Sequence, residues 1–152
     1  MNQDEELFVE YFGERFGVRK KLWDSFEILV GKRTVYIRAA EEKFPRGWEV
    51  ENAGFRVARL TSNLFKPGNR LLQWLGEEVK RSIVEINAEE FKKILERKLV
   101  VPSLSPGCSR GFVALKFRGK VAGCGFWTGE ELQTQISKGL SSQLTEKAIE
   151  RA

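Results

Sequence analysis

The sequence predicts an α+β fold of two consecutive units: an N-terminal α+β domain over residues 1–81, then a small β-barrel with a rim helix over residues 82–143. Three observations predict it: helical spacing of apolar residues at the start, alternating apolar and polar residues in short segments, and a strand, helix and hairpin in the second half. A chain of 152 residues can bury one core, or two small cores that share an interface. We expect residues 144–152 to form a tail or short helix.

The first half combines one helix with alternating segments. Apolar residues recur at helical spacing over residues 4–16, and Gly17 supplies a C-terminal stop. Residues 32–38 and 55–60 alternate in the manner of half-buried strands. A short apolar helix over residues 71–75 follows a turn, which completes the predicted α+β unit.

The second half opens with a short apolar strand over residues 82–86. Asn87 is a good N-cap, and Glu90 stands three residues further on, which is the spacing of a capping box. The apolar residues Phe91 and Ile94 then form one helical stripe. We therefore predict a helix directly after this strand.

Residues 111–127 predict a β-hairpin with Arg118-Gly119 at its tip. Gly123 and Gly125 weaken the return strand but allow a bulge or close backbone packing. Alternation places the side chains of the first strand on two faces: Val113, Leu115 and Phe117 on one, and Phe112, Ala114 and Lys116 on the other.

The charge distribution favours a polyanionic partner. The chain has 26 basic and 21 acidic residues, a net charge of +5. The first fourteen residues contain five of the acids and no base, so the remainder has a basic excess of ten. Such an excess fits phosphate neutralisation by a nucleic-acid binder, and solubility alone is the alternative explanation.

Missing residue types exclude several kinds of site. There is no His, which removes His-based triads and His metal sites. The two cysteines, Cys108 and Cys124, have no CxxC spacing, and Cys124 fits a buried small hydrophobe better than a nucleophile. Gly123, Gly125 and Gly129 lack the helix start that a dinucleotide loop needs. We therefore predict no metal and no cofactor.

The sequence gives no indication of a membrane or a secretory route. No apolar run approaches the ~20 residues of a membrane span, and the acidic N-terminus is unlike a signal peptide. We expect an intact cytoplasmic protein without membrane contact.

The order strand, helix, strand and hairpin over the second half resembles the PUA domain, an RNA-binding module. The segment most similar to it is the hairpin of residues 111–127 (GFVALKFRGKVAGCGFW). The continuation from Thr128-Gly129 to Ser137-Lys138-Gly139-Leu140 is similar to the tail of the PUA-like domain in Sun-family RNA cytosine methyltransferases. The Phe-rich helix and strands of the first half resemble the pre-PUA domain of those enzymes and of a family of ribosome-biogenesis factors. The resemblance covers nearly the whole chain and implies RNA binding.

The chain departs from that family in several places. It has no room for the methyltransferase catalytic domain, and in Pro106-Gly107-Cys108 a glycine separates the residues of a catalytic Pro-Cys pair. The helix passes through Arg97-Lys98 without the usual terminal glycine, and Ser137 stands where the methyltransferase tail has proline.

The predicted RNA-binding residues are the basic residues of the second unit together with one aromatic side chain. Lys and Arg suit phosphate contact, and Trp127 either stacks on a base or packs in the core. A second basic group near the first helix end extends this surface or only suits the helix dipole. The first set is Lys93, Arg97, Lys98, Arg110, Lys116, Arg118, Lys120, Trp127 and Lys138, and the second is Arg15, Arg19, Lys20, Lys21, Lys32 and Arg33.

We expect a protein that binds structured RNA (tRNA or rRNA) without catalysis, in RNA modification or ribosome biogenesis, with an RNA-modification enzyme or ribosome-assembly protein as a further partner. The alternative is a targeting or protein-interaction subunit of a separately encoded RNA methyltransferase. A third reading, a carboxylate-dependent nuclease, lacks a metal-ligand pattern in acids such as Asp24, Glu41, Glu42 and Glu49.

Overall fold

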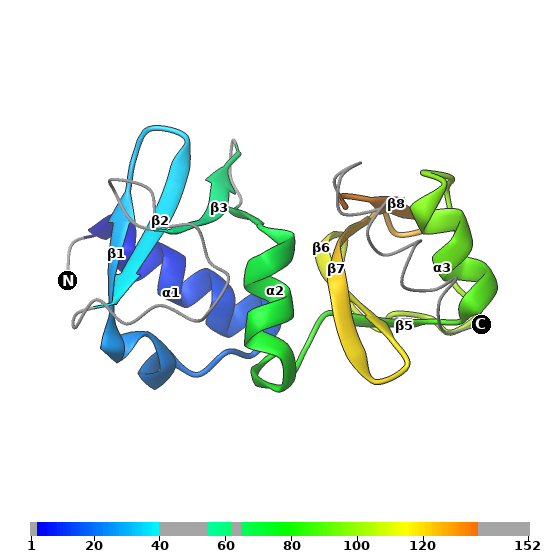
Figure 1. The fold of residues 1–152 in the computed structure, drawn as a ribbon, viewed down its shortest axis with the longest axis horizontal. Coiled ribbons are helices and arrows are strands. Elements are labelled where there is room, and N and C mark those ends of the chain that lie inside the picture. The colour runs from blue at the N-terminus through cyan, green and yellow to red at the C-terminus, as the bar shows by residue number, and fades with distance from the viewer. Residues whose placement is uncertain (1–2, 40–54, 62–64, 137–152) are drawn as a thin grey trace.

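The structure, a computed structural model, describes residues 3–39, 55–61 and 65–136 and has a mixed α+β fold (Figure 1). Its elements are α1 (Gln3–Phe16), the 3-10 helix η1 (Lys20–Ser25), β1 (Phe26–Val30), β2 (Thr34–Ala39), β3 (Phe55–Leu60), β4 (Phe65–Pro67), α2 (Asn69–Leu75), the 3-10 helix η2 (Gly76–Glu78), β5 (Ile83–Ile86), α3 (Ala88–Leu95), β6 (Gly111–Phe117), β7 (Lys120–Trp127) and β8 (Leu132–Thr134). The strands form two four-stranded sheets, β1-β2-β3-β4 and β5-β6-β7-β8.

The first helix ends where the sequence predicts. Gly17 adopts a φ of 68°, and its N–H donates to the Gly13 carbonyl at 3.0 Å. This is the left-handed C-terminal motif that glycine adopts without steric cost. The chain can therefore turn back at Gly17 and lead through η1 into the first sheet.

A β-bulge changes one predicted orientation in the first sheet. Alternation places Val57 inside and Ala58 outside, yet both are buried. Strand β2 pairs Val35 with Ala58 and Tyr36 with Arg56, so Val57 is an extra residue on β3. Because a bulge adds one residue to one strand, two consecutive side chains can both face the core.

The second sheet combines a parallel pair with the predicted hairpin. Strand β5 pairs in parallel with β6, and α3 lies in the crossover that a parallel pair requires. Strands β6 and β7 are antiparallel and joined by Arg118 and Gly119. Both turn residues have positive φ, 50° and 80°, as in a type I′ turn, whose twist matches the flanking strands.

The expected closed β-barrel is wrong for the part of the chain that is described. No strand pairing joins the edge strands β5 and β8 there, so the sheet is open. Strand β8 has three residues, and beyond it only an isolated bridge joins Val100 to Leu132. Helix α3 covers the open side with Phe91 and Ile94, so the hydrophobic core is closed by a helix and not by strand pairing.

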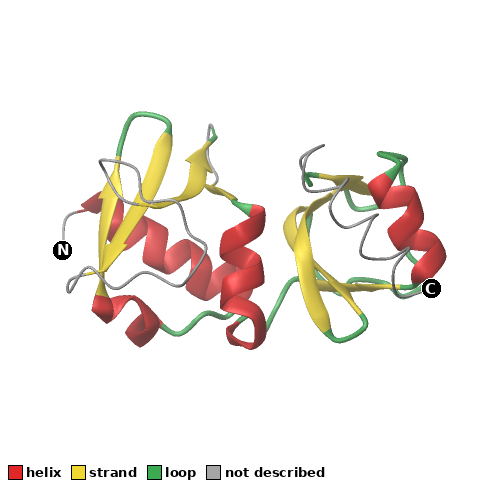
Figure 2. Ribbon diagram, viewed as in Figure 1, coloured by secondary structure: helices red, strands yellow, loops and turns green. Residues whose placement is uncertain are grey.

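The hairpin is buried on both faces, one toward each unit (Figure 2). Val113 and Leu115 pack in the second core with α3, as the alternation predicts. Phe112, Ala114 and Cys124 pack in the first core, with α1, α2 and the first sheet. The two sheets thus lie on either side of the predicted boundary between residues 81 and 82. The first hydrophobic core crosses this boundary, because side chains of the hairpin belong to it.

Helix α2 is joined to the hairpin by hydrogen bonds from two amide side chains. Asn69 accepts from the Cys124 N–H through Oδ1 at 2.7 Å and donates to the Gln135 carbonyl at 3.1 Å. Gln73 donates to the Ala122 carbonyl at 2.7 Å. A Cβ at Gly123 would lie 2.8 Å from Asn69 Oδ1, so the close packing predicted for this glycine is confirmed.

None of the helices that the structure describes is long and apolar enough to cross a membrane. The predicted C-terminal tail and Lys138 lie outside the described residues.

Candidate nucleic-acid interface

Helix α3 and its C-terminal end position three of the predicted RNA-binding residues. Lys93 is exposed on the helix. Lys98 is exposed too, but its Nζ lies 2.9 Å from a carboxylate oxygen of Glu96, and this hydrogen bond lowers the pKa of Glu96. The Arg97 guanidinium donates to the Ile136 carbonyl at 2.7 Å. Only Lys93 of the three has no polar partner among the described residues.

Arg97 occupies the position where a helix usually ends in glycine. Its φ is 64°, its N–H donates to the Ile94 carbonyl, and the Lys98 N–H donates to the Lys93 carbonyl. These bonds form a Schellman motif with arginine in the left-handed position. A hydrogen bond from its guanidinium to the Ile136 carbonyl holds Arg97 in this left-handed conformation, so the helix can end here without a glycine.

The hairpin tip carries a separate basic group, formed by Lys116, Arg118 and Lys120. Arg118 and Lys120 are exposed and Lys116 is half-buried. The Arg118 guanidinium lies 4.9 Å from the centre of the Phe117 ring, a cation–π distance. None of the three forms an ion pair within the part of the chain that the structure describes, so their charges are free for phosphate.

The helix end and the hairpin tip lie at opposite ends of the second sheet (Figure 1). The start of α3 is close to the tip, because the Phe91 and Phe117 rings are 4.4 Å apart. From Phe91 the helix runs on for four residues to Leu95, or ~6 Å at 1.5 Å per residue. The basic residues that were predicted to form one surface thus form separate groups.

The two remaining described candidates, Trp127 and Arg110, lie along the hairpin. Trp127 is half-buried and packs against the second core, and its role in base stacking stays a prediction. Arg110 is exposed just before β6, with its guanidinium 5.5 Å from the Phe126 ring centre. Arg110 belongs to a third basic group, in a cleft between the two units.

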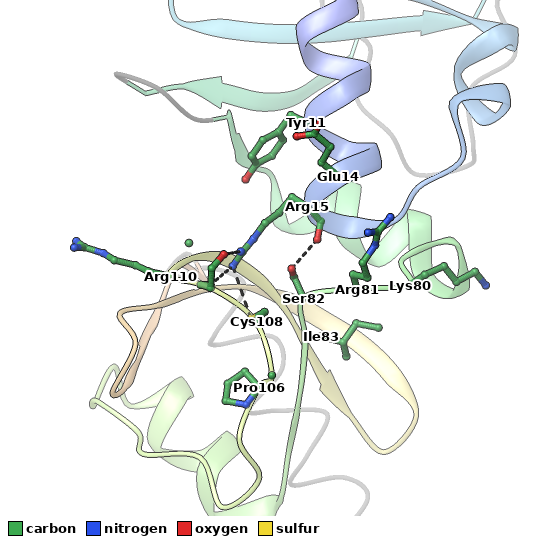
Figure 3. Close-up of a pocket in the computed structure, with 13 residues that line it drawn as sticks. Tyr11, Glu14, Arg15, Lys80, Arg81, Ser82, Ile83, Pro106, Cys108 and Arg110 are labelled. Carbon is green, nitrogen blue, oxygen red and sulfur yellow. Dashed lines mark hydrogen bonds between the residues drawn. The ribbon is translucent and has the colours of Figure 1, made fainter.

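That cleft has a volume of about 700 Å³ and is formed by α1, the segment before β5 and the loop before β6 (Figure 3). Its walls bring together residues distant in the sequence. Its polar and charged side chains are Tyr11, Glu14, Arg15, Lys80, Arg81, Ser82, Cys108, Ser109 and Arg110.

Arg15 joins the two sides of the cleft. It projects from α1 and donates from Nε to the Phe112 carbonyl at 2.8 Å, and from Nη1 and Nη2 to Ser109 Oγ and the Ser109 carbonyl, both at 2.9 Å. A Cβ at Gly111 would lie 3.0 Å from Arg15 Cζ, so the glycine makes room for this guanidinium. All these acceptors are neutral, so the described residues leave the positive charge of Arg15 uncompensated.

Three further cations and one acid lie around Arg15. Lys80, Arg81 and Arg110 are exposed, and Arg81 donates to the Gly13 carbonyl at 3.1 Å. Glu14 is the single acid among the lining residues and forms no ion pair with them. The cleft therefore has a clear positive excess.

Tyr11 also lines the cleft, but its hydroxyl does not open onto it. The hydroxyl is buried and has no hydrogen-bond partner among the described residues. Burial raises the pKa of Tyr11 well above its usual value, although Arg15 acts in the opposite direction. The phenol is therefore a protonated donor at neutral pH.

The sequence did not predict this cleft. Lys80 and Arg81 were not among the predicted site residues, and Arg15 was placed in a different group. No local pattern could have found them, because they meet Arg110 only through the packing of the hairpin against the N-terminal unit. The other predicted members of the Arg15 group, Arg19, Lys20, Lys21, Lys32 and Arg33, do not line the cleft.

No model of a known protein family matches the chain, and no curated protein matches it either. The described residues contain no group of three or more Cys, Asp or Glu side chains able to hold a metal ion. The main features of the described surface are the basic hairpin tip and the basic cleft.

Proposed function

We propose that the chain is a non-catalytic RNA-binding protein of the pre-PUA and PUA type, which binds structured RNA (tRNA or rRNA) in RNA modification or ribosome biogenesis in the cytoplasm. One observation carries the proposal: exposed Lys and Arg side chains at the hairpin tip and in the cleft have no ion-pair partner among the described residues. Lys and Arg side chains that form no ion pair can neutralise the phosphates of a polyanion and release its bound counterions.

The residues support recognition of shape and backbone over reading of base sequence. Lys side chains act as point charges on phosphates, whereas Arg can grip two phosphate oxygens at once. Arg118 is held over Phe117, so less side-chain entropy is lost when it meets a phosphate. Such contacts fix the register of an RNA without specifying its sequence.

Two features support the PUA relationship. The second unit has the strand, helix and hairpin of the order that the resemblance implies, although the strand expected between helix and hairpin is only an isolated bridge at Val100. The Gly-x-Gly of the return strand packs closely, with a Cβ at Gly125 reaching to within 3.0 Å of Leu115. The open sheet is the feature that differs from a PUA barrel.

A salt-series titration tests the function. We expect the protein to bind tRNA or rRNA fragments more tightly than duplex DNA, with an affinity that falls steeply with salt. Each phosphate contact contributes a slope of about 0.7–0.9 in log K against log salt. Absence of binding even at low salt would remove the proposal.

A matched pair of variants tests the surface. The double variant Arg118→Gln with Lys120→Gln removes two charges from the hairpin tip. Arg56→Gln with Arg59→Gln removes two exposed charges from β3, on the other sheet. We expect the first variant to reduce the slope of log K against log salt by the amount that corresponds to one or two phosphate contacts. The second variant should leave the slope unchanged. Equal losses in both would indicate only a net-charge effect.

The exposed apolar side chains of Leu99, Val101 and Leu104 favour a second candidate, a targeting subunit of a separately encoded RNA methyltransferase. Their exposed fractions are 54%, 75% and 62%. Adjacent exposed apolar residues are typical of protein-contact surfaces. Co-purification of a methyltransferase that survives nuclease treatment, and is lost in Val101→Ser with Leu104→Ser, would support this candidate.

A further inference from the structure

The cleft between the two units is suited to an anion because four cationic residues line it, contributed by three segments of the chain. Arg15 comes from α1, Lys80 and Arg81 from the connection into β5, and Arg110 from the loop before β6 (Figure 3). The Arg15 guanidinium is fixed by four hydrogen bonds, three to oxygen atoms of Ser109 and Phe112 and a longer one to Cys108 Sγ, so its position is set before any ligand arrives. A partly buried cation with no described counter-ion strongly attracts an anion from solvent.

The donors around the cleft fit an oxyanion with several acceptor oxygens. Guanidinium and ammonium groups donate only, and the hydroxyl of the exposed Ser109 adds one further polar group. A phosphate offers three or more strong acceptors, and arginine matches its geometry in a bidentate manner. Glu14 weakens the field without cancelling the four positive charges around it.

We propose that the cleft formed by Arg15, Lys80, Arg81 and Arg110 is a binding site for a phosphate or diphosphate group. In its RNA form this inference rests on the proposed function, since the phosphate then belongs to the backbone or an end of the bound RNA. The same chemistry would bind a free small phosphate compound. Arg15 holds the cleft together, and the exposed side chains of Arg81 and Arg110 stand at its edge and turn onto the ligand when it binds.

The experiment uses the full chain and two probes, inorganic pyrophosphate and the RNA that binds wild type most tightly. The cleft variant is Arg81→Gln with Arg110→Gln, which leaves Arg15 and its structural contacts in place. The control variant, Arg56→Gln with Arg59→Gln, has the same net charge and changes two exposed residues of β3 that do not line the cleft. Unfolding curves of both establish that each is folded before binding is measured by calorimetry.

We expect wild type and the control variant to bind pyrophosphate, and the cleft variant to bind it at least about tenfold more weakly, since charge-assisted hydrogen bonds are lost. If the cleft variant loses as much affinity for RNA as it loses for pyrophosphate, the phosphate that the cleft binds belongs to RNA. Unchanged RNA affinity with lost pyrophosphate binding identifies a free phosphate compound.

The failures of the two proposals are distinguishable. If wild type binds pyrophosphate through the cleft but binds no RNA, the phosphate site stands and the RNA-binding function falls. If RNA binds normally while the cleft variant and wild type do not differ with either probe, the phosphate site is overturned and the RNA-binding function stands.

Discussion

Cys124 lies fully buried on β7, on the face of the hairpin that packs against the N-terminal unit. Burial raises the pKa of its thiol from 9.0 to about 12, because a thiolate there would lose its hydration. The thiol of the unfolded chain ionises near the lower value. The folded state is therefore favoured fully below pH 9, and this contribution is lost as the pH rises toward 12.

We predict that the free energy of unfolding falls above pH 9, by up to ~1.4 kcal/mol per pH unit from this one group. Urea unfolding between pH 7 and 10.5 measures it, with Cys124→Ala as the control whose alkaline fall is shallower. Burial of Tyr11 adds a fall of the same sign, starting nearer pH 10. Identical slopes for wild type and Cys124→Ala between pH 9 and 10 would contradict the prediction.

At the scale of elements, the N-terminus of α3 depends on one carboxylate with two separate tasks. Glu90 Oε1 accepts from the Asn87 N–H at 2.8 Å, which completes the capping box that the sequence predicts. Its Oε2 accepts from the Ser103 N–H, also at 2.8 Å, which the sequence does not reveal. The side chain is 7% exposed, so both bonds lie largely out of solvent.

We predict that Glu90→Gln destabilises the protein by ~1–3 kcal/mol, although its shape is conserved. An amide has a single acceptor oxygen, so its NH₂ group would face either the Asn87 or the Ser103 N–H. Glu89→Gln removes the same charge from an exposed position in the same helical turn and is the matched control. Urea midpoints compare the two, and equal midpoints would show that Glu90 acts only through its charge.

The elements with a clear period were predictable, and those that depend on a distant neighbour were not. The limits of α1, α3 and the hairpin follow from spacing, Gly17 and Asn87. The inward orientation of Ala58 depends on the bulge at Val57, the extra residue of β3 that has no partner on β2. The open sheet depends on the short β8, whose length no local pattern marks.

At the scale of the whole molecule, the candidate site was predictable only in part. The basic excess and the bases of the hairpin tip can be read from the sequence. The cleft cannot, because it exists only where Phe112 and Ala114 pack against the N-terminal core and bring Arg110 to Arg15. Alternation along β6 indicates two faces, but it does not say that a second unit covers one of them.

The shared hairpin also predicts that the two units unfold together. Side chains from successive positions of β6 enter both cores, and Asn69 and Gln73 bind the hairpin backbone. Loss of the first core would therefore expose Phe112, Ala114 and Cys124 on the strands that hold the second core. Phe12→Ala, at a fully buried position in the first core, should cost ~3–5 kcal/mol.

Native-state hydrogen exchange can test this coupling. We expect Phe12→Ala to lower the protection of the Val35 amide in β2 and of the Val84 amide in β5 by the same factor, since both open in one cooperative event. Leu7→Ala, at a half-exposed position of the same helix, is the control and should change both far less. Reduced protection in β2 with unchanged protection in β5 would mean that the hairpin and α3 remain folded alone, and that the cleft can open without unfolding the second unit.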